Sequence, residues 1–217
     1  MRLSHFLLAL LSIAALSGCS SVAYKAKMPD VSSNCVDSLG AVHSTVLAYP
    51  PAGEDADDTY LEFATVARCH RTADGVAVPV ALYRLQGVTP PAEVNVSVML
   101  SPGGTFAAAV DVLDSDFQSL RRYDFREFVR RGSQYSLNVF LNPTAKMPAY
   151  LLLTPDREQV GKEDTAIGSA ANTMVIPAGP VMFMYNNGTE TRTIRPFLEG
   201  GKVLVTVRPQ STAIADD

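Results

Sequence analysis

Cysteine is the residue type in this chain with the widest choice of chemistry, and it occurs three times, as Cys19, Cys35 and Cys69. A thiol can be modified covalently, form a disulfide, or bind a metal ion as the thiolate. Which of these applies depends on the compartment in which the chain folds, because disulfides persist only under oxidising conditions. The signals that direct the chain to a compartment therefore have to be considered first.

The first eighteen residues have the order of a secretory signal. Arg2 supplies positive charge, the run Phe6–Leu16 is apolar except at Ser12, and the small pair Ser17-Gly18 follows it. This order is typical of a signal peptide that is removed on export. The apolar run is shorter than the ~20 residues that a membrane-spanning helix needs. We therefore expect the mature chain to begin after residue 18.

The end of this segment, Leu16-Ser17-Gly18-Cys19, resembles the lipobox of bacterial lipoproteins. The resemblance implies that Cys19 is lipidated and becomes the first residue of the mature chain. Ser20 stands where an aspartate would favour retention in the inner membrane, so the expected location is the outer membrane, facing the periplasm. The alternative is an ordinary signal peptide that carries a cysteine by chance.

Cys35 and Cys69 then remain as an even pair in an oxidising compartment, which favours a disulfide. Such a bridge stabilises the fold by ~3.8 kcal/mol through the entropy of loop closure. It would hold the segment after the tether against a strand expected at Leu61–Ala67. The alternative is a metal site with His43 and His70, but the sequence has no Cys-x2-Cys pair. We expect the disulfide and no metal.

Composition indicates one globular domain. Hydrophobic residues make up 47% of the chain, charged residues 18%, and the formal net charge is −4. We expect a signal peptide over residues 1–18, a lipidated cysteine and tether over 19–34, and a single domain over 35–217. Basic residues gather only at Arg121-Arg122 and Arg130-Arg131, too few to neutralise a nucleic acid backbone. No nucleic acid partner is expected.

The pattern of apolar residues predicts an all-β fold, a β-sandwich or jelly roll. Strands are expected at residues 60–66, 76–85, 94–100, 106–113, 135–141, 150–153, 181–185, 189–194 and 202–208. Pro79 suggests an edge or a bulge, and Ser101–Gly104 a turn. Asn187-Gly188 indicates a tight hairpin, residues 155–172 a loop with at most one helical turn, and residues 121–131 a short helix as an alternative to a strand.

Four of these segments resemble the maltose operon periplasmic protein family over about residues 60–208. They are Pro79–Leu85, Glu93–Leu100, Phe106–Asp114 and Ala149–Pro155. The resemblance implies an exported β-sandwich with a carbohydrate connection, and no catalytic residue comes with it. This chain departs from the best-known member, which is longer at its C-terminus and begins with a plain signal peptide.

No arrangement of residues indicates an enzyme, and no cofactor is expected. Only His43 and His70 remain after processing, and the sequence lacks the Gly-x-Ser-x-Gly elbow of hydrolases. The acidic clusters Asp55–Asp58 and Asp111–Asp116 could bind calcium, but they lack the EF-hand spacing, and solvated loop carboxylates are the favoured interpretation. We expect a protein that binds rather than catalyses.

Carbohydrate binding usually places an aromatic ring beside a few polar groups. The chain has no tryptophan, so tyrosine has to supply the ring. Tyr49, beside two prolines, and Tyr123, among arginines, are expected to be exposed, whereas Tyr83, Tyr150 and Tyr185 lie in apolar strands and should be core. The sequence thus predicts a lipid-anchored envelope protein that binds maltodextrin or another glycan. The alternative is a structural or assembly module that binds another envelope protein.

Overall fold

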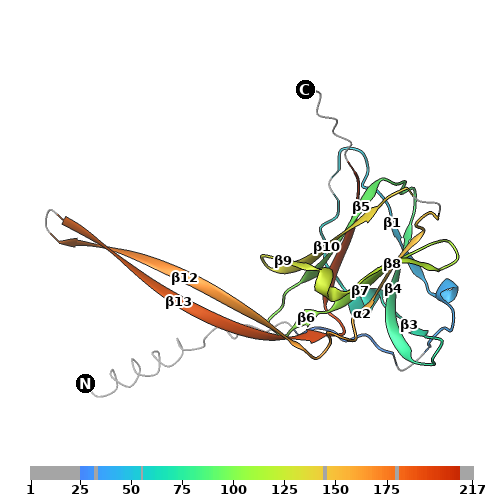
Figure 1. Ribbon diagram of the computed structural model, residues 1–217, viewed down its shortest axis with the longest axis horizontal. Coiled ribbons are helices and arrows are strands. Elements are labelled where there is room, and N and C mark those ends of the chain that lie inside the picture. Colours follow the sequence, from blue (N-terminus) through green and yellow to red (C-terminus); the bar gives the residue numbers. More distant parts are fainter. Residues whose placement is uncertain (1–24, 32–33, 55, 144–145, 179–180, 211–217) are drawn as a thin grey trace, which may run out of the picture.

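The computed structural model describes residues 25–31, 34–54, 56–143, 146–178 and 181–210, and the lipobox lies outside them. Figure 1 shows a body of packed sheets from which one long hairpin projects. The predicted all-β class is confirmed. The strands are β1 (Ser44–Leu47), β2 (Leu61–Glu62), β3 (Arg68–Arg71), β4 (Ala77–Leu85), β5 (Ala92–Met99), β6 (Thr105–Phe106), β7 (Ala108–Leu113), β8 (Ser119–Tyr123), β9 (Val129–Arg131), β10 (Gln134–Leu141), β11 (Tyr150–Pro155), β12 (Glu163–Ala178), β13 (Val181–Leu198) and β14 (Lys202–Pro209).

Two sheets form the body. One has the order β1-β4-β11-β7-β8, with β3 also paired to β4, and the other has the order β2-β14-β5-β10-β9. Alternate residues of β5 point into the space between them, so Val94, Val96 and Val98 are fully buried while their neighbours face outward. From the first sheet, Leu151 and Leu153 of β11 contribute to the same core. The body is therefore a β-sandwich.

The segment expected as a strand over residues 60–66 is mostly not a strand. Only Leu61 and Glu62 pair, with β14, and residues Phe63–Val66 form the short helix α2. The backbone N–H of Phe63 donates to the carbonyl of Gly201 at 2.8 Å, which turns the chain inward. The Phe63 ring is then fully buried and stacks on Phe106 at 4.4 Å between centroids. Burial of this ring outweighs the loose alternation of the segment.

The disulfide Cys35–Cys69 is confirmed, with a Cα–Cα distance of 4.4 Å. Its partner strand is β3 rather than the segment Leu61–Ala67. Val36 donates its backbone N–H to the carbonyl of Cys69 at 3.0 Å, and Arg71 donates to the carbonyl of Val36 at 2.8 Å. The bridge thus lies beside a short parallel contact that joins the N-terminal segment to the first sheet.

Other local expectations have mixed outcomes. Ser101 and Gly104 form a bridge across the predicted turn, and Pro79 lies where β4 pairs with β3, beyond Ala81, the last residue of β4 that pairs with β11. Residues 121–131 hold the end of β8, the 3-10 turn η3 (Phe125–Glu127) and β9. A second 3-10 turn, η2 (Leu39–Ala41), precedes β1.

The projecting hairpin, here called the arm, consists of β12 and β13, with 16 and 18 residues. Antiparallel pairing runs from Glu163↔Pro196 to Ala178↔Val181, a length of roughly 50 Å at ~3.4 Å per residue. The predicted loop over residues 155–172 is wrong, because β12 begins inside it. The predicted turn at Asn187-Gly188 is also wrong, since both residues pair within the ladder, with Asn172 and Ala171. Tyr185 lies on this arm and not in a strand of the body.

The base of the arm is fixed to the body. Phe197 and Leu198 of β13 pair in parallel with Thr105 and Phe106 of β6. The Phe197 ring also meets the buried Phe125 ring edge-on at 4.9 Å between centroids. The orientation of the arm at its base is therefore set by contacts with the core.

Gly104 allows this close approach, and its replacement tests it. Its φ is +134°, and a Cβ there would lie 2.6 Å from Leu198 Cδ1 and 2.8 Å from the carbonyl oxygen of Pro196. Because such overpacking costs about 1–3 kcal/mol, we expect Gly104→Ala to lower the melting temperature by several degrees. Gly132→Ala is the control, since its φ is also positive but no atom lies within 4 Å. Equal melting temperatures for the two variants would contradict the close contact.

Candidate functional site

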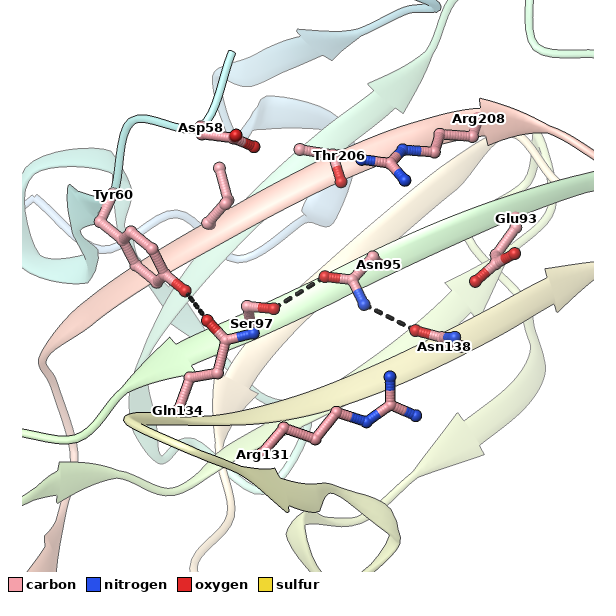
Figure 2. Close-up of a pocket in the computed structure, with 11 residues that line it drawn as sticks. Asp58, Tyr60, Glu93, Asn95, Ser97, Arg131, Gln134, Asn138, Thr206 and Arg208 are labelled. Carbon is pink, nitrogen blue, oxygen red and sulfur yellow. Dashed lines mark hydrogen bonds between the residues drawn. The ribbon is translucent and has the colours of Figure 1, made fainter. Parts of the chain in front are cut away.

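A polar groove of about 510 Å³ lies on the outer face of the second sheet (Figure 2). Strands β5, β10 and β14 form its floor, and the ends of β9 and the segment before β2 flank it. Most of its residues can donate or accept hydrogen bonds. They are Asp58, Tyr60, Glu93, Asn95, Ser97, Arg131, Gln134, Asn138, Leu204, Thr206 and Arg208.

Strand register aligns these residues in rows across the sheet. Asn95 of β5 lies between Asn138 of β10 and Thr206 of β14. The next row places Ser97 between Ser136 and Leu204. Residues two apart on a strand share a face, so the outward face of this sheet is polar where its inward face is valine. Alternation in the predicted strand 94–100 already indicated this polar face, but not which strands lie beside it.

Direct hydrogen bonds connect the floor of the groove. The Ser97 hydroxyl donates to Asn95 Oδ1 at 2.7 Å, and the Asn95 amide donates to Asn138 Oδ1 at 2.6 Å. Ser97 is buried, whereas the two asparagines are half-exposed. Because each amide has two donors and an acceptor with two lone pairs, both side chains keep hydrogen-bonding capacity toward the groove.

Tyr60 closes one end of the groove. Its hydroxyl donates to Gln134 Oε1, and the Gln134 amide donates to the Ser136 hydroxyl at 3.1 Å. Partial burial, and to a lesser extent the charge of Asp58, raises the pKa of Tyr60, while a hydrogen bond with Ser97 opposes this. The phenol therefore stays protonated at neutral pH and acts as a donor. Tyr60 is not among the tyrosines predicted to bind a ligand, although it is the tyrosine that lines the groove.

Charged residues at the rim carry both signs. Asp58 and Glu93 are acidic, and Arg131 and Arg208 are basic. Arg131, Arg208 and Asp58 are exposed, and Glu93 is half-buried. Equal numbers of the two signs leave the groove without a strong net field, so nothing in it favours a highly charged ligand.

The two tyrosines predicted for ligand binding lie elsewhere. Tyr49 is half-buried and donates its hydroxyl to the carbonyl of Thr89 at 3.1 Å. Tyr123 is buried, and the Arg121 guanidinium covers its ring at 4.5 Å from the centroid, so the expectation that Tyr123 is exposed is wrong. Neighbouring arginines indicated a solvated position, but the arginine stem and charge pack on the ring instead. Tyr83 is core as expected, and burial raises its pKa to about 12.

The two histidines within the described residues, His43 and His70, do not meet in one cleft with a serine and a carboxylate. His43 is exposed just before β1, and His70 lies in β3 beside the disulfide. Burial lowers the pKa of His70, against a smaller effect of Asp37. Neither residue lines the polar groove.

The acidic cluster Asp111–Asp116 has structural contacts. Asp111 accepts from Arg122 at 2.6 Å, and Asp114 accepts backbone N–H groups of Asp116 and Gln118 at 3.0 and 2.8 Å. These backbone bonds lower the pKa of Asp114. In the other acidic cluster, Asp55 lies outside the described residues. Over the described part of the chain, no group of three or more histidines, cysteines or acidic residues is placed to hold a metal ion.

No family model, curated protein or solved structure matches this chain. The resemblance to the maltose operon periplasmic protein family therefore stays a prediction. Among the helices of the described residues, none is long and apolar enough to cross a membrane.

Proposed function

We propose that this protein binds a neutral oligosaccharide in the polar groove and is held at the outer membrane by a lipid on Cys19. One observation supports this function most directly, namely the hydrogen-bonded row Ser97–Asn95–Asn138 on an open sheet face. Sugar hydroxyls donate and accept at the same atom, and amide side chains offer both kinds of partner. No catalytic step is part of the proposal.

Aromatic rings lie near both ends of the groove. Tyr60 borders one end, and Phe140, which is 49% exposed, is in register with Glu93 at the other. Gln134 and Phe140 are six positions apart on β10, a span of about 20 Å. An aromatic face supports a sugar ring through its apolar side, so this spacing fits several linked sugars better than one.

The balance of charge indicates the class of sugar. Two acidic and two basic residues at the rim suit an uncharged chain such as a maltodextrin, and a polyanion would meet Asp58 and Glu93. The resemblance to the maltose operon family supports the same class. A peptidoglycan fragment is the competing glycan, because it is abundant in the periplasm and carries carboxylates.

Thermal unfolding of the purified protein with maltooligosaccharides and with peptidoglycan fragments tests the function. A ligand at 100 times its dissociation constant stabilises the fold by about 2.7 kcal/mol, equivalent to roughly 5–10 °C here. We expect this rise with maltooligosaccharides. Asn138→Ala should reduce the rise strongly, because it removes the amide that accepts from Asn95 at one end of the row, whereas Asn142→Ala, an exposed asparagine just beyond β10, should keep it.

The absence of a rise with every sugar would contradict the proposal, as would equal loss in both asparagine variants. The alternative, an assembly module, would then gain support from the free edge at β9. All three residues of β9 are exposed, and β9 pairs only with β10 among the described strands. Crosslinking in the outer membrane would then identify a protein partner.

A further inference from the structure

The distal end of the arm exposes large apolar side chains. Met182 and Met184 are 75% and 76% exposed, Met174 is 61% exposed, and Val175 is 50% exposed. Val175 pairs with Met184, and both share a face with Met182. Met174 is adjacent to Val175 and so lies on the opposite face. Both faces of the arm are therefore apolar at this end.

Polarity changes in steps along the arm. The charged residues of the ladder, Glu163, Asp164, Glu190, Arg192 and Arg195, all lie in its half nearer the base, whereas residues 165–189 contain no charged residue. The middle of the ladder is rich in Gly, Ala, Ser, Thr and Asn. The pairs at the distal end are rich in Met, Val, Ile and Phe. The residues of the arm are thus charged near the base, polar and uncharged in the middle, and apolar at the distal end. The surroundings change in the same order from water through lipid headgroups to acyl chains.

A bilayer covers this end better than a protein surface does. A partner laid on one face of the arm would leave the apolar residues of the other face in water, at a cost of roughly 25 cal/mol per Å². Lipid surrounds an inserted segment on every side. We propose that the distal end of the arm inserts into a lipid bilayer, with Met182 in the acyl region and Met174 at the headgroup boundary.

The open edges of the arm limit how deep this insertion goes. Beyond the base, β12 and β13 pair only with each other in the described structure, so outward N–H and C=O groups lack strand partners. Each such group costs several kcal/mol in hydrocarbon. Insertion of about 5–10 Å, typical of segments that lie at the membrane interface, places about three residues of each strand among the lipids. The arm therefore enters one leaflet and does not span the membrane.

Tryptophan fluorescence tests the insertion, because the chain contains no tryptophan. Met182→Trp places a single reporter at the end of the arm. Val46→Trp places one on β1, an exposed position on the side of the body away from the arm (Figure 1). Each full-length variant is added to phospholipid vesicles, some of which contain lipids brominated near the headgroup or near the chain end.

With vesicles, the emission of Met182→Trp should shift to the blue and lose most of its intensity to bromine near the headgroup, and less to bromine near the chain end. The emission of Val46→Trp should not change. Loss of emission in neither variant, or equal loss in both, would overturn the proposal. A blue shift of Met182→Trp that depends on protein concentration without vesicles would also overturn it, in favour of contact between copies. Met184→Trp is a second reporter if the first variant does not fold.

Discussion

Replacing Phe106 with alanine is expected to lower the free energy of unfolding by about 3–5 kcal/mol. Phe106 is fully buried, and its ring stacks on Phe63 at 4.4 Å between centroids. Truncation removes buried apolar surface and leaves a cavity that the neighbouring strands fill only in part. For a domain of this size, the melting temperature should fall by roughly 6–20 °C.

Thermal unfolding followed by circular dichroism measures this effect. Phe140→Ala is the matched control, because it makes the same chemical change at a half-exposed position on β10. Substitutions at such positions usually change stability by less than about 0.5 kcal/mol. A fall in melting temperature as small for Phe106→Ala as for the control would show that the two aromatic rings do not form the packed contact described above.

Removing the disulfide should have an effect of similar size. The double variant Cys35→Ser, Cys69→Ser is expected to lose ~3.8 kcal/mol, because its unfolded state regains the entropy that the closed loop removes. The melting temperature should fall by roughly 8–15 °C. The fold itself should persist, since the backbone hydrogen bonds between Val36, Cys69 and Arg71 do not depend on the sulfur atoms.

Reduction of the unmodified protein provides the control for this variant. In dithiothreitol, the unmodified protein should melt at the temperature of the double variant, and the double variant should not respond to the reductant. Lipidation at Cys19, which uses a different thiol, should be unaffected. An unchanged melting curve of the unmodified protein, with both thiols shown to be free, would contradict a stabilising role for the bridge.

The body of the fold was largely predictable from sequence because each of its main strands buries one face. In β5, valines alternate with polar residues, and this alternation marks both the strand and its buried side. In β14, valines recur at every second position, alternating with Leu204, Thr206 and Arg208. Cys35 and Cys69 were predictable as a pair because the lipid proposed for Cys19 leaves them as the two remaining thiols. The strand predicted at residues 60–66 was too long, since the burial of Phe63 ends β2 after two residues.

The arm was not predictable by the same logic. Beyond its base, β12 projects away from the packed sheets (Figure 1), and its sequence lacks the alternation that identifies a half-buried strand. Backbone hydrogen bonds with β13 hold β12 in place. Such bonds do not depend on residue type, so the sequence does not reveal them. Asn187-Gly188 suits a tight turn, but both residues pair within the ladder, whose last described pair is Ala178↔Val181. A local preference was thus overridden by pairing along the whole hairpin.

The sequence predicted which residues of a single strand face outward, but not the groove that neighbouring strands form together. Asn95 and Ser97 were recognisable as the outward face of one strand, but their neighbours depend on which strands pair. Tyr60 reaches the groove because the chain before β2 passes its end, and no local pattern encodes that path (Figure 2). Sequence reasoning therefore selected Tyr49 and Tyr123, whereas the tyrosine that lines the groove is Tyr60.

The last strand of the described residues, β14, also determines when this fold can be completed. In the second sheet, β14 is an inner strand that lies between β2 and β5, and its residues Val203 and Val207 are buried in the core. Val203 pairs with Val98, far back in the chain, so this sheet depends on a late, non-local contact. If the chain is exported from its N-terminus onward, β5 keeps this edge open until β14 arrives. The nascent protein would thus need protection from aggregation throughout its translocation.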